Sequence, residues 1–388
     1  MKNFRIEEYL ADLSHIVSID SGTFSEAGTN AMAEFFKKRY EDLGLRAEIS
    51  WQDGYRPAPF LTVSGGKSSG KLPAGKDADI LMIGHMDTVF PDGTAAARPY
   101  SIDGAGHVRG PGCLDCKGGI LLMYYLIKCM MAEGEIGFSF IIGLNSDEER
   151  GSGYSRAKFE ELARRSGRCL VFEPGRAGGE FVRHRKGGAN YTVRCRGIAA
   201  HSGVCPEKGA SAILELARQT DAIYREWFRP ADGTTVNIGR FDGGGDGGAV
   251  PDYAEFTVSF RCMEEKVFRK FDRYIMSMGD DGRRFDPRCA IEVERRTVRP
   301  PMVPDGRVEE MLALLSETGG ELGQTVEAVS TGGGSDGNFI SPCGCPTLDG
   351  CGPVGSCMHT EDEYLEIPTV EQRLDIMRGM LLRMFPVK

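Results

Sequence analysis

The chain has 388 residues, of which 41% are hydrophobic and 27% are charged, and its formal net charge at pH 7 is −9. This length exceeds what one ordinary hydrophobic core supports, so we expect two domains, and the composition is that of a folded globular protein. The negative charge argues against nucleic acid and anionic membranes as main partners.

No targeting or membrane segment is expected. Residues 1–9 carry acids where a signal peptide needs an apolar core, and no apolar run is long enough to span a bilayer. We therefore expect a cytoplasmic protein whose 12 cysteines are reduced thiols. Cys113 and Cys116 have the spacing of a redox pair or a thiolate zinc site, and four further cysteines lie within residues 343–357. We favour neither role, because the later group lacks paired spacing and the earlier pair flanks an aspartate in a glycine-rich loop.

Hydrophobic periodicity predicts helices alternating with short apolar strands in the first half of the chain. This alternation favours an α/β fold with a mixed, mostly parallel sheet flanked by helices. The predicted helices are 6–17, 30–43 (with Thr29 as cap and Gly44 as stop), 120–131 and 154–165, and the predicted strands are 46–51, 60–63, 79–84, 137–144 and 168–172.

From about Gly187 the pattern changes to β-α-β-β-α-β, which fits an inserted ferredoxin-like α+β domain. Glycines before it and Val298–Pro301 after it suggest a lid that can move. We divide the chain into a discontinuous domain, residues 1–186 and 298–388, and an inserted domain, residues 187–297. The inserted strands are predicted at 189–196, 234–241, 254–261 and 290–296 and its helices at 211–228 and 266–278, and a helix over 371–385 closes the chain.

Three consecutive acids, Asp147, Glu148 and Glu149, follow the predicted strand 137–144. Neighbouring carboxylates at the end of a buried strand repel one another unless cations are present. The triplet could begin a helix, where acids suit the helix dipole. It could equally belong to a metal site in which one glutamate binds metal and the other activates water. Taken alone, the triplet leaves both interpretations open.

Two other predicted strands end in residues of the same kind. His85 and Asp87 follow strand 79–84 and share one face of an extended chain, which suits an imidazole ligand oriented by a carboxylate. Glu173 follows strand 168–172. The carboxyl ends of parallel strands meet at one edge of a sheet, where such folds build their sites. A hydrogen-bonded histidine would explain one such strand end, but three form a pattern.

Two loops complete the candidate site. Asp115 lies in a glycine-rich loop that fits neither common phosphate-binding pattern, and it could instead cap the helix that follows. His359 lies in a polar loop, where solvent exposure is the commoner fate. With one bridging carboxylate, these donors can hold two ions, and borderline-soft Zn²⁺ accepts such a mixture readily. The donors are His85, Asp115, Glu149, Glu173 and His359, with Glu148 left as a general base.

Six motifs spread over nearly the whole chain resemble those of one family. They are His85-Met86-Asp87-Thr88-Val89, Gly110-Pro111-Gly112-x-x-Asp115-x-Lys117-Gly118-Gly119, Asp147-Glu148-Glu149-x-Gly151-Ser152, Glu173-Pro174, His201-Ser202-Gly203 and Gly332-Gly333-Gly334-Ser335-Asp336. The chain resembles the dizinc metallopeptidases that include glutamate carboxypeptidase, aminoacylase, acetylornithine deacetylase and succinyl-diaminopimelate desuccinylase, and it is most similar to the bacterial glutamate carboxypeptidases.

This resemblance implies a ligand set for two zinc ions per chain, with cobalt or manganese as alternatives. His85 and Glu173 would hold one ion and Glu149 and His359 the other, with Asp115 bridging and a cis peptide bond after it. The resemblance also implies that Asp87 orients His85 and that Glu148 deprotonates water.

The resemblance also implies which groups contact the substrate. His201, on the inserted domain, would stabilise the oxyanion in its own site or in that of a neighbouring subunit, in a homodimer formed through the inserted domain. Arg261 and Arg299 would bind the substrate's α-carboxylate. Gly333 and Ser335 lie in a glycine turn expected beside the substrate. The implied activity is hydrolysis of the amide bond to a C-terminal amino acid. The alternatives are an N-acyl amino acid deacylase or dipeptidase and, in another class, a non-catalytic ligand-binding homologue.

The sequence departs from the family pattern at two positions. Cys116 follows the bridging aspartate, where Asp or Met is usual, and Gly248 replaces an asparagine expected three residues before Pro251. Asp246 or Asn237 could compensate for the second change. Glu at position 173 fits the carboxypeptidase and deacylase branch, because the aminopeptidase branch tends to use Asp there.

Overall fold

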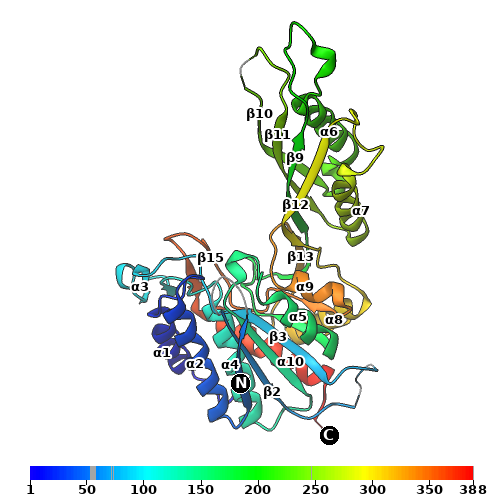
Figure 1. The fold of residues 1–388 in the computed structure, drawn as a ribbon. Coiled ribbons are helices and arrows are strands. Elements are labelled where there is room, and N and C mark those ends of the chain that lie inside the picture. Colours follow the sequence, from blue (N-terminus) through cyan, green and yellow to red (C-terminus); the bar gives the residue numbers. More distant parts are fainter. Residues whose placement is uncertain (53–57, 71, 73, 246, 388) are drawn as a thin grey trace. The chain divides into compact units, whose positions relative to one another are not determined.

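A computed structural model describes residues 1–52, 58–70, 72, 74–245 and 247–387 (Figure 1). The chain folds into two compact units. The first contains Met1–His184, Pro304–Thr331 and Ser335–Lys388, and the second contains Arg185–Val303 and Gly332–Gly334. No helix in the described ranges is long and apolar enough to cross a membrane.

A six-stranded sheet forms the centre of the first unit, in the order β1 (Arg46–Gln52), β2 (Ala58–Gly65), β6 (Phe140–Asn145), β3 (Ala78–His85), β7 (Ser166–Val171) and β14 (Thr347–Leu348). Strand β3 runs parallel to both β6 and β7, β14 runs parallel to β7, and β1, β2 and β6 pair antiparallel. The predicted mixed α/β sheet is therefore confirmed. Its central strands β3 and β6 are buried along their whole length, which explains their uninterrupted apolar sequences.

Helices cover both faces of this sheet (Figure 1). Along β3, Ile80 and Met82 join the core on one face, and Leu81 and Ile83 join the core on the other. The first core is formed with α1 (Ile6–Val17), α2 (Glu26–Asp42), α4 (Lys117–Ala132), α8 (Gly306–Glu321) and α10 (Ile367–Met384). The second core is formed with α5 (Arg156–Arg165) and α9 (Gly337–Ile340).

The predicted start of the second helix is wrong. Helix α2 begins at Glu26, so Thr29 lies inside it, and its hydroxyl donates to the carbonyl oxygen of Ser25 at 2.9 Å. Its first residues lack apolar periodicity, but packing against the preceding segment holds them: a Cβ on Gly28 would lie 1.7 Å from the carbonyl oxygen of Asp20. Helix α10 likewise starts earlier than predicted, with Pro368 in its first turn.

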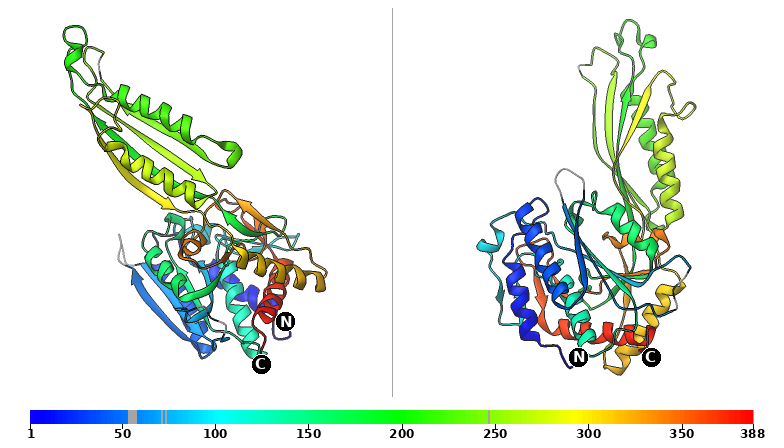
Figure 2. Two further views of the ribbon diagram at one scale, coloured as in Figure 1. Left: turned by 90° about the vertical axis from the view of Figure 1, so that its right-hand side faces the viewer. Right: turned by 60° about the horizontal axis from the view of Figure 1, so that its bottom comes forward.

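The second unit has the predicted order of elements. These are β9 (Gly187–Arg196), α6 (Ala212–Trp227), β10 (Thr235–Gly243), β11 (Tyr253–Cys262), α7 (Glu265–Met276) and β12 (Ala290–Arg299). The strands pair antiparallel in the order β10-β11-β9-β12, which is the ferredoxin-like arrangement. Both helices cover one face of the sheet, as the right-hand view of Figure 2 shows.

A small sheet in the first unit brings two distant loops together. Strand β5 (His107–Arg109) pairs antiparallel with β16 (Tyr364–Glu366), so Arg109 lies opposite Tyr364. The glycine-rich loop that begins at Gly110 therefore starts beside the end of the loop that carries His359. Short strands of this kind have no periodicity to reveal them, and the sequence did not predict this pairing.

Candidate metal centre

The candidate residues gather where three parallel strands end. His85 at the end of β3 is in register with Asn145 at the end of β6, and Ile83 is in register with Val171 of β7. The acidic turn after β6 and Glu173 after β7 thus lie at the same sheet edge as His85. This is the edge at which open α/β sheets place their sites.

Asp115 stands between two groups of donor atoms. Its Oδ1 lies 3.1 Å from His85 Nε2, which in turn lies 3.6 Å from an oxygen of Glu173. Its Oδ2 lies 3.0 Å from His359 Nε2, which lies 3.3 Å from Glu149 Oε2. One carboxylate therefore belongs to both groups, and within each group the candidate atoms lie within 4.8 Å of one another.

The electrostatics of these residues fit bound cations. Burial and the neighbouring Asp115 carboxylate raise the pKa of Glu173 well above its ordinary value. Hydrogen bonds to Asp115 and Glu149 raise the pKa of His359 to about 10. Glu149 Oε1 is buried with no hydrogen-bond partner among the described residues. Carboxylates held this close need positive charge, and two imidazoles with three carboxylates are donors that divalent transition metals accept.

Asp87 connects His85 to the acidic turn. Its carboxylate accepts hydrogen bonds from the backbone N–H groups of Glu148 and Glu149, both at 3.2 Å, and from the hydroxyl of Thr23 at 2.7 Å. His85 Nδ1 lies 2.9 Å from the carbonyl oxygen of Asp87 and 3.4 Å from its Oδ1. Asp87 therefore fixes the imidazole ring and the turn together. Sequence reasoning missed Thr23, which has no neighbouring motif to mark it.

The acidic turn combines features of both interpretations, a helix start and a candidate site. Glu148–Arg150 form a short 3₁₀ turn, and Asp147 is buried beneath it. The Asp147 carboxylate accepts hydrogen bonds from the backbone N–H of Tyr154 at 2.8 Å and from the Ser155 hydroxyl, just before α5. Asp147 thus supports the following helix, while Glu149 joins the donor cluster and Glu148 stays half-buried beside it.

Backbone hydrogen bonds to a buried carboxylate fix the loop that carries Asp115. The peptide bond between Asp115 and Cys116 is cis, as the resemblance implied. The buried carboxylate of Glu363 accepts hydrogen bonds from the backbone N–H groups of Gly112, Leu114 and Asp115, at 2.8, 3.0 and 2.9 Å. Sequence reasoning also missed Glu363, although it follows His359 by only four residues.

The cysteines form no disulfide, and all of them lie in the described ranges. Cys116 Sγ is close to the His85 group but donates to the carbonyl oxygen of Phe172 at 3.1 Å. Cys113 is buried against the carbonyl oxygen of Val108. Burial raises the pKa of both thiols well above the ordinary value, which opposes a thiolate role.

The remaining predicted residues divide between the units. His201, Arg261, Arg299 and Gly333 belong to the second unit, and Ser335 belongs to the first, where its hydroxyl donates to the buried carboxylate of Asp349.

Within the second unit, His201 is exposed, and its Nδ1 accepts a hydrogen bond from the Gly203 N–H at 3.1 Å. Burial lowers the pKa of Arg261. The Gly248 carbonyl accepts a hydrogen bond from the Ser202 N–H at 3.0 Å, and Asn237 lies on β10. Asp246 lies outside the described residues.

Comparison with known proteins identifies relatives that match most of the chain. The sequence profile described as "Peptidase family M20/M25/M40" matches residues 81–383. Carboxypeptidase G2 of Pseudomonas sp. (strain RS-16) is 28% identical over 95% of this chain and 88% of its own length. Succinyl-diaminopimelate desuccinylase of Cupriavidus taiwanensis is 27% identical over 97% of this chain and 98% of its own.

The fold is similar to that of a solved peptidase. The crystal structure of aminopeptidase PepT from Bacillus cereus ATCC 10987 superposes with a TM-score of 0.72, at 23% identity, over 97% of this chain and 98% of its own. At 23% sequence identity, this similarity supports a shared fold and does not extend to function.

Proposed function

The chain belongs to peptidase family M20/M25/M40, and from this membership we propose that it hydrolyses the amide bond joining an acyl or peptidyl group to a C-terminal amino acid. Membership makes it a metal-dependent hydrolase of the peptidase and deacylase type; the proposal concerns the bond that it cuts. The observation that carries the proposal is the position of Asp115, whose two carboxylate oxygens face His85 and His359 separately.

We assign His85 and Glu173 to one ion and Glu149 and His359 to a second, with Asp115 shared. Zinc is the ion that this donor set favours, and cobalt or manganese are alternatives. Two divalent ions held by these residues would lower the pKa of water and would polarise a carbonyl oxygen. The backbone carbonyl oxygen and the carboxylate of Asp87 both contact His85 Nδ1, the ring nitrogen that does not face Asp115. These contacts keep the His85 ring oriented.

Glu148 acts as the general base. The backbone N–H of Glu148 donates a hydrogen bond to the Asp87 carboxylate, which fixes the Glu148 backbone beside the donor cluster. The Glu148 carboxylate takes a proton from the attacking water and returns it to the leaving amine, a role for which a positioned carboxylate contributes about 10²–10⁴-fold. The roles expected for His201 at the oxyanion and for Arg261, Arg299 and Gly333 at the substrate stay predictions. The Ser335 side chain is buried and donates to Asp349, which argues against its direct contact with substrate.

A second candidate is an N-acyl amino acid deacylase or dipeptidase. The observation that favours it is the 27% identity to a desuccinylase over nearly the full length of both chains. The two candidates differ in what the enzyme recognises: a carboxypeptidase requires the free α-carboxylate after the scissile bond, whereas a deacylase depends more on the acyl group before it.

The test is a hydrolysis screen of the metal-loaded protein against N-acyl amino acids, dipeptides and folyl-glutamate, each with a free or amidated C-terminal carboxylate. The carboxypeptidase assignment predicts loss of turnover on amidation. Glu148→Gln should abolish turnover while two ions per chain remain bound, as measured by elemental analysis. Glu161→Gln, on the exposed side of α5, is the matched control. Activity retained in Glu148→Gln would exclude this base, and no preference for a free carboxylate would exclude the carboxypeptidase.

A cytoplasmic location and a homodimer formed through the inserted domain stay predictions. Strand β10 lies at one edge of the inserted sheet, so its outer backbone groups can pair with another chain. Sedimentation at several concentrations measures the oligomeric state, and a monomer at all concentrations would contradict the dimer.

A further inference from the structure

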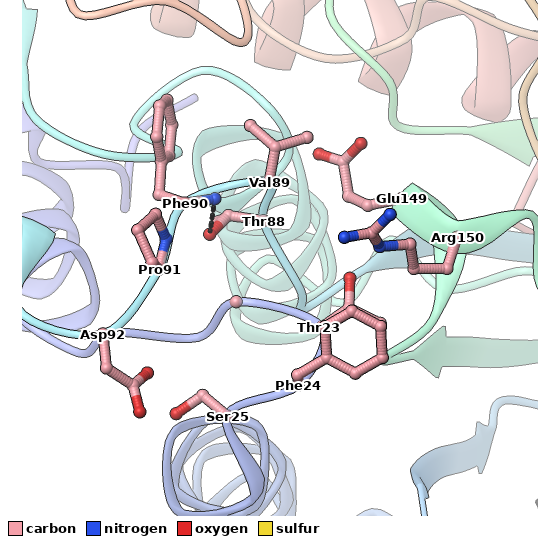
Figure 3. A pocket seen from close by; sticks show the side chains of 11 residues that line it. Thr23, Phe24, Ser25, Thr88, Val89, Phe90, Pro91, Asp92, Glu149 and Arg150 are labelled. Carbon is pink, nitrogen blue, oxygen red and sulfur yellow. Dashed lines mark hydrogen bonds between the residues drawn. The ribbon is translucent and has the colours of Figure 1, made fainter. Parts of the chain in front are cut away.

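A cavity of about 630 Å³ opens in the first unit beside Glu149 (Figure 3). Its walls come from three segments: Gly22–Ser25 after α1, Thr88–Asp92 after β3, and Glu149–Arg150 of the acidic turn. This volume lies in the range of cavities that hold small ligands. Because Glu149 belongs to the donor group around Asp115 and His359, the cavity borders the candidate metal centre.

The cavity is built on the same elements that position His85. The backbone N–H of Thr88 donates to the carbonyl oxygen of Ser21 at 2.9 Å, and that of Thr23 donates to the carbonyl oxygen of Thr88 at 3.2 Å. A Cβ on Gly22 would lie 2.2 Å from the carbonyl oxygen of Phe90, so only glycine permits this approach. The two walls are therefore fixed relative to each other and to Asp87.

Arg150 is the cation of this cavity. Its guanidinium lies over the ring of Phe24, 4.8 Å from the ring centre, and it forms no ion pair with a carboxylate in the part of the chain that the structure describes. The neighbouring Glu149 carboxylate turns instead toward His359. Asp92, the acid at the cavity's other end, lies near Ser25 and away from Arg150 (Figure 3). The guanidinium thus keeps hydrogen-bond donors available to a ligand.

The walls beside Arg150 are apolar and exposed. Phe24 is 62% exposed and Val89 is 42% exposed, which is unusual for large apolar side chains lining one cavity. Thr23, Phe24 and Arg150 also line a second cavity of about 200 Å³, so the two cavities share these three residues. An apolar wall that leads to a guanidinium matches a short hydrocarbon chain ending in a carboxylate.

We propose that this cavity binds the acyl side of the substrate and that Arg150, held over Phe24, selects acyl groups that end in a carboxylate. The inference rests on the proposed amide hydrolysis and adds the class of acyl group that the enzyme accepts. Arg150 is a specificity-determining residue here, and the reaction itself stays with Glu148 and the donor cluster.

The test compares acyl groups of equal length with and without the carboxylate. N-succinyl and N-butyryl derivatives of one amino acid form a matched pair, and N-glutaryl and N-pentanoyl derivatives form a second. We expect kcat/KM to favour the charged member by about 10- to 100-fold, as one charge-assisted pair supplies. Arg150→Gln should reduce this ratio to near one, mainly through KM of the charged substrate. The exposed Arg165→Gln is the control and should keep the ratio.

Binding is measured separately from turnover. Calorimetry of the metal-loaded Glu148→Gln protein with succinamate and with butyramide should detect tighter binding of succinamate, and adding Arg150→Gln should abolish the difference. If both acyl series are hydrolysed equally, the inference fails and the proposed function stands. If none of the N-acyl amino acids, dipeptides and folyl-glutamate of the hydrolysis screen is cleaved, the proposed function fails. Succinamate binding that persists in the Arg150→Gln protein, or that never exceeds butyramide binding, overturns the inference by itself.

Discussion

The carboxylate of Glu363 accepts the backbone N–H of Asp115 at 2.9 Å, although 248 residues separate the two in sequence. The same carboxylate holds the N–H groups of Gly112 and Leu114, so it determines the path of the loop that presents Asp115. His359 lies on the same segment as Glu363. One short stretch near the C-terminus thus supplies a candidate ligand and also the support of the shared ligand.

Glu363→Gln should weaken metal binding by about 10- to 100-fold, the usual effect of losing a group that orients a ligand. A glutamine keeps the size but turns an N–H toward backbone N–H groups that need an acceptor. Competition with a chromogenic chelator measures the affinity, and circular dichroism checks the fold. Glu361→Gln, exposed on the same loop, is the control. Equal affinities for Glu363→Gln and the native chain would contradict this role.

Asp87→Asn should lower kcat by about 10- to 100-fold, because it disturbs His85 and the Glu148–Glu149 turn together. The native carboxylate accepts from two backbone N–H groups and a hydroxyl, and an amide can accept on only one of its two ends. Steady-state kinetics on the best substrate of the screen provides the measurement. The exposed Asp42→Asn should behave as the native chain; a similar loss there would show that the effect is not specific to Asp87.

Removing the metal should destabilise the first unit as well as abolish turnover. Without cations, Asp115, Glu149 and Glu173 face one another at close range. A ligand at 100 times its Kd stabilises the native state by about 2.7 kcal/mol, which corresponds to a fall in Tm of about 5–10 °C on its removal. Calorimetric scans before and after chelation, and again after adding Zn²⁺ back, measure this shift. An unchanged Tm would argue against metal bound to these residues.

The carboxylate of Asp79, which lies far from the donor cluster, should stabilise the folded state in a way that is lost in acid. Burial raises the pKa of this carboxyl, but hydrogen bonds from Ser69 and Ser139 outweigh burial, and the net pKa lies below its ordinary value. A lowered folded-state pKa stabilises the fold above the unfolded value of about 3.9, and the contribution is lost as pH falls through the folded-state pKa.

Asp79→Asn should therefore reduce the free energy of unfolding by about 1–3 kcal/mol at pH 7 and by less at pH 3, because the native contribution fades as pH falls toward the folded-state pKa. Urea unfolding at both pH values measures the difference. Asp77→Asn, two residues earlier and exposed, should change little at either pH. A loss of stability for Asp79→Asn that is the same at pH 3 and pH 7 would exclude the ionised carboxylate as its cause.

The sequence predicted the parts of the fold and site whose signals are local. Apolar runs located β3, β6 and β7, and the residues immediately after them located His85, the acidic triplet and Glu173. The β-α-β-β-α-β order predicted the second fold, because each of its elements is long enough to show periodicity.

What escaped prediction depends on long-range packing. Thr23 meets Asp87 across 64 residues and Glu363 meets Asp115 across 248, and nothing near either residue in sequence indicates its partner. Helix α2 starts at Glu26 because Gly28 packs against Asp20, not because its first turn is amphipathic. The cavity beside Arg150 likewise exists only when three separate segments meet.

The donor cluster draws on both ends of the chain. His85, Asp115, Glu149 and Glu173 precede the inserted domain, whereas His359 and Glu363 follow it. During synthesis, the ribosome therefore makes the whole insertion before the last donor emerges. A nascent chain that stops short of His359 lacks one candidate donor and also the carboxylate that supports the Asp115 loop. Completion of the candidate site therefore requires synthesis of the chain almost to its last helix.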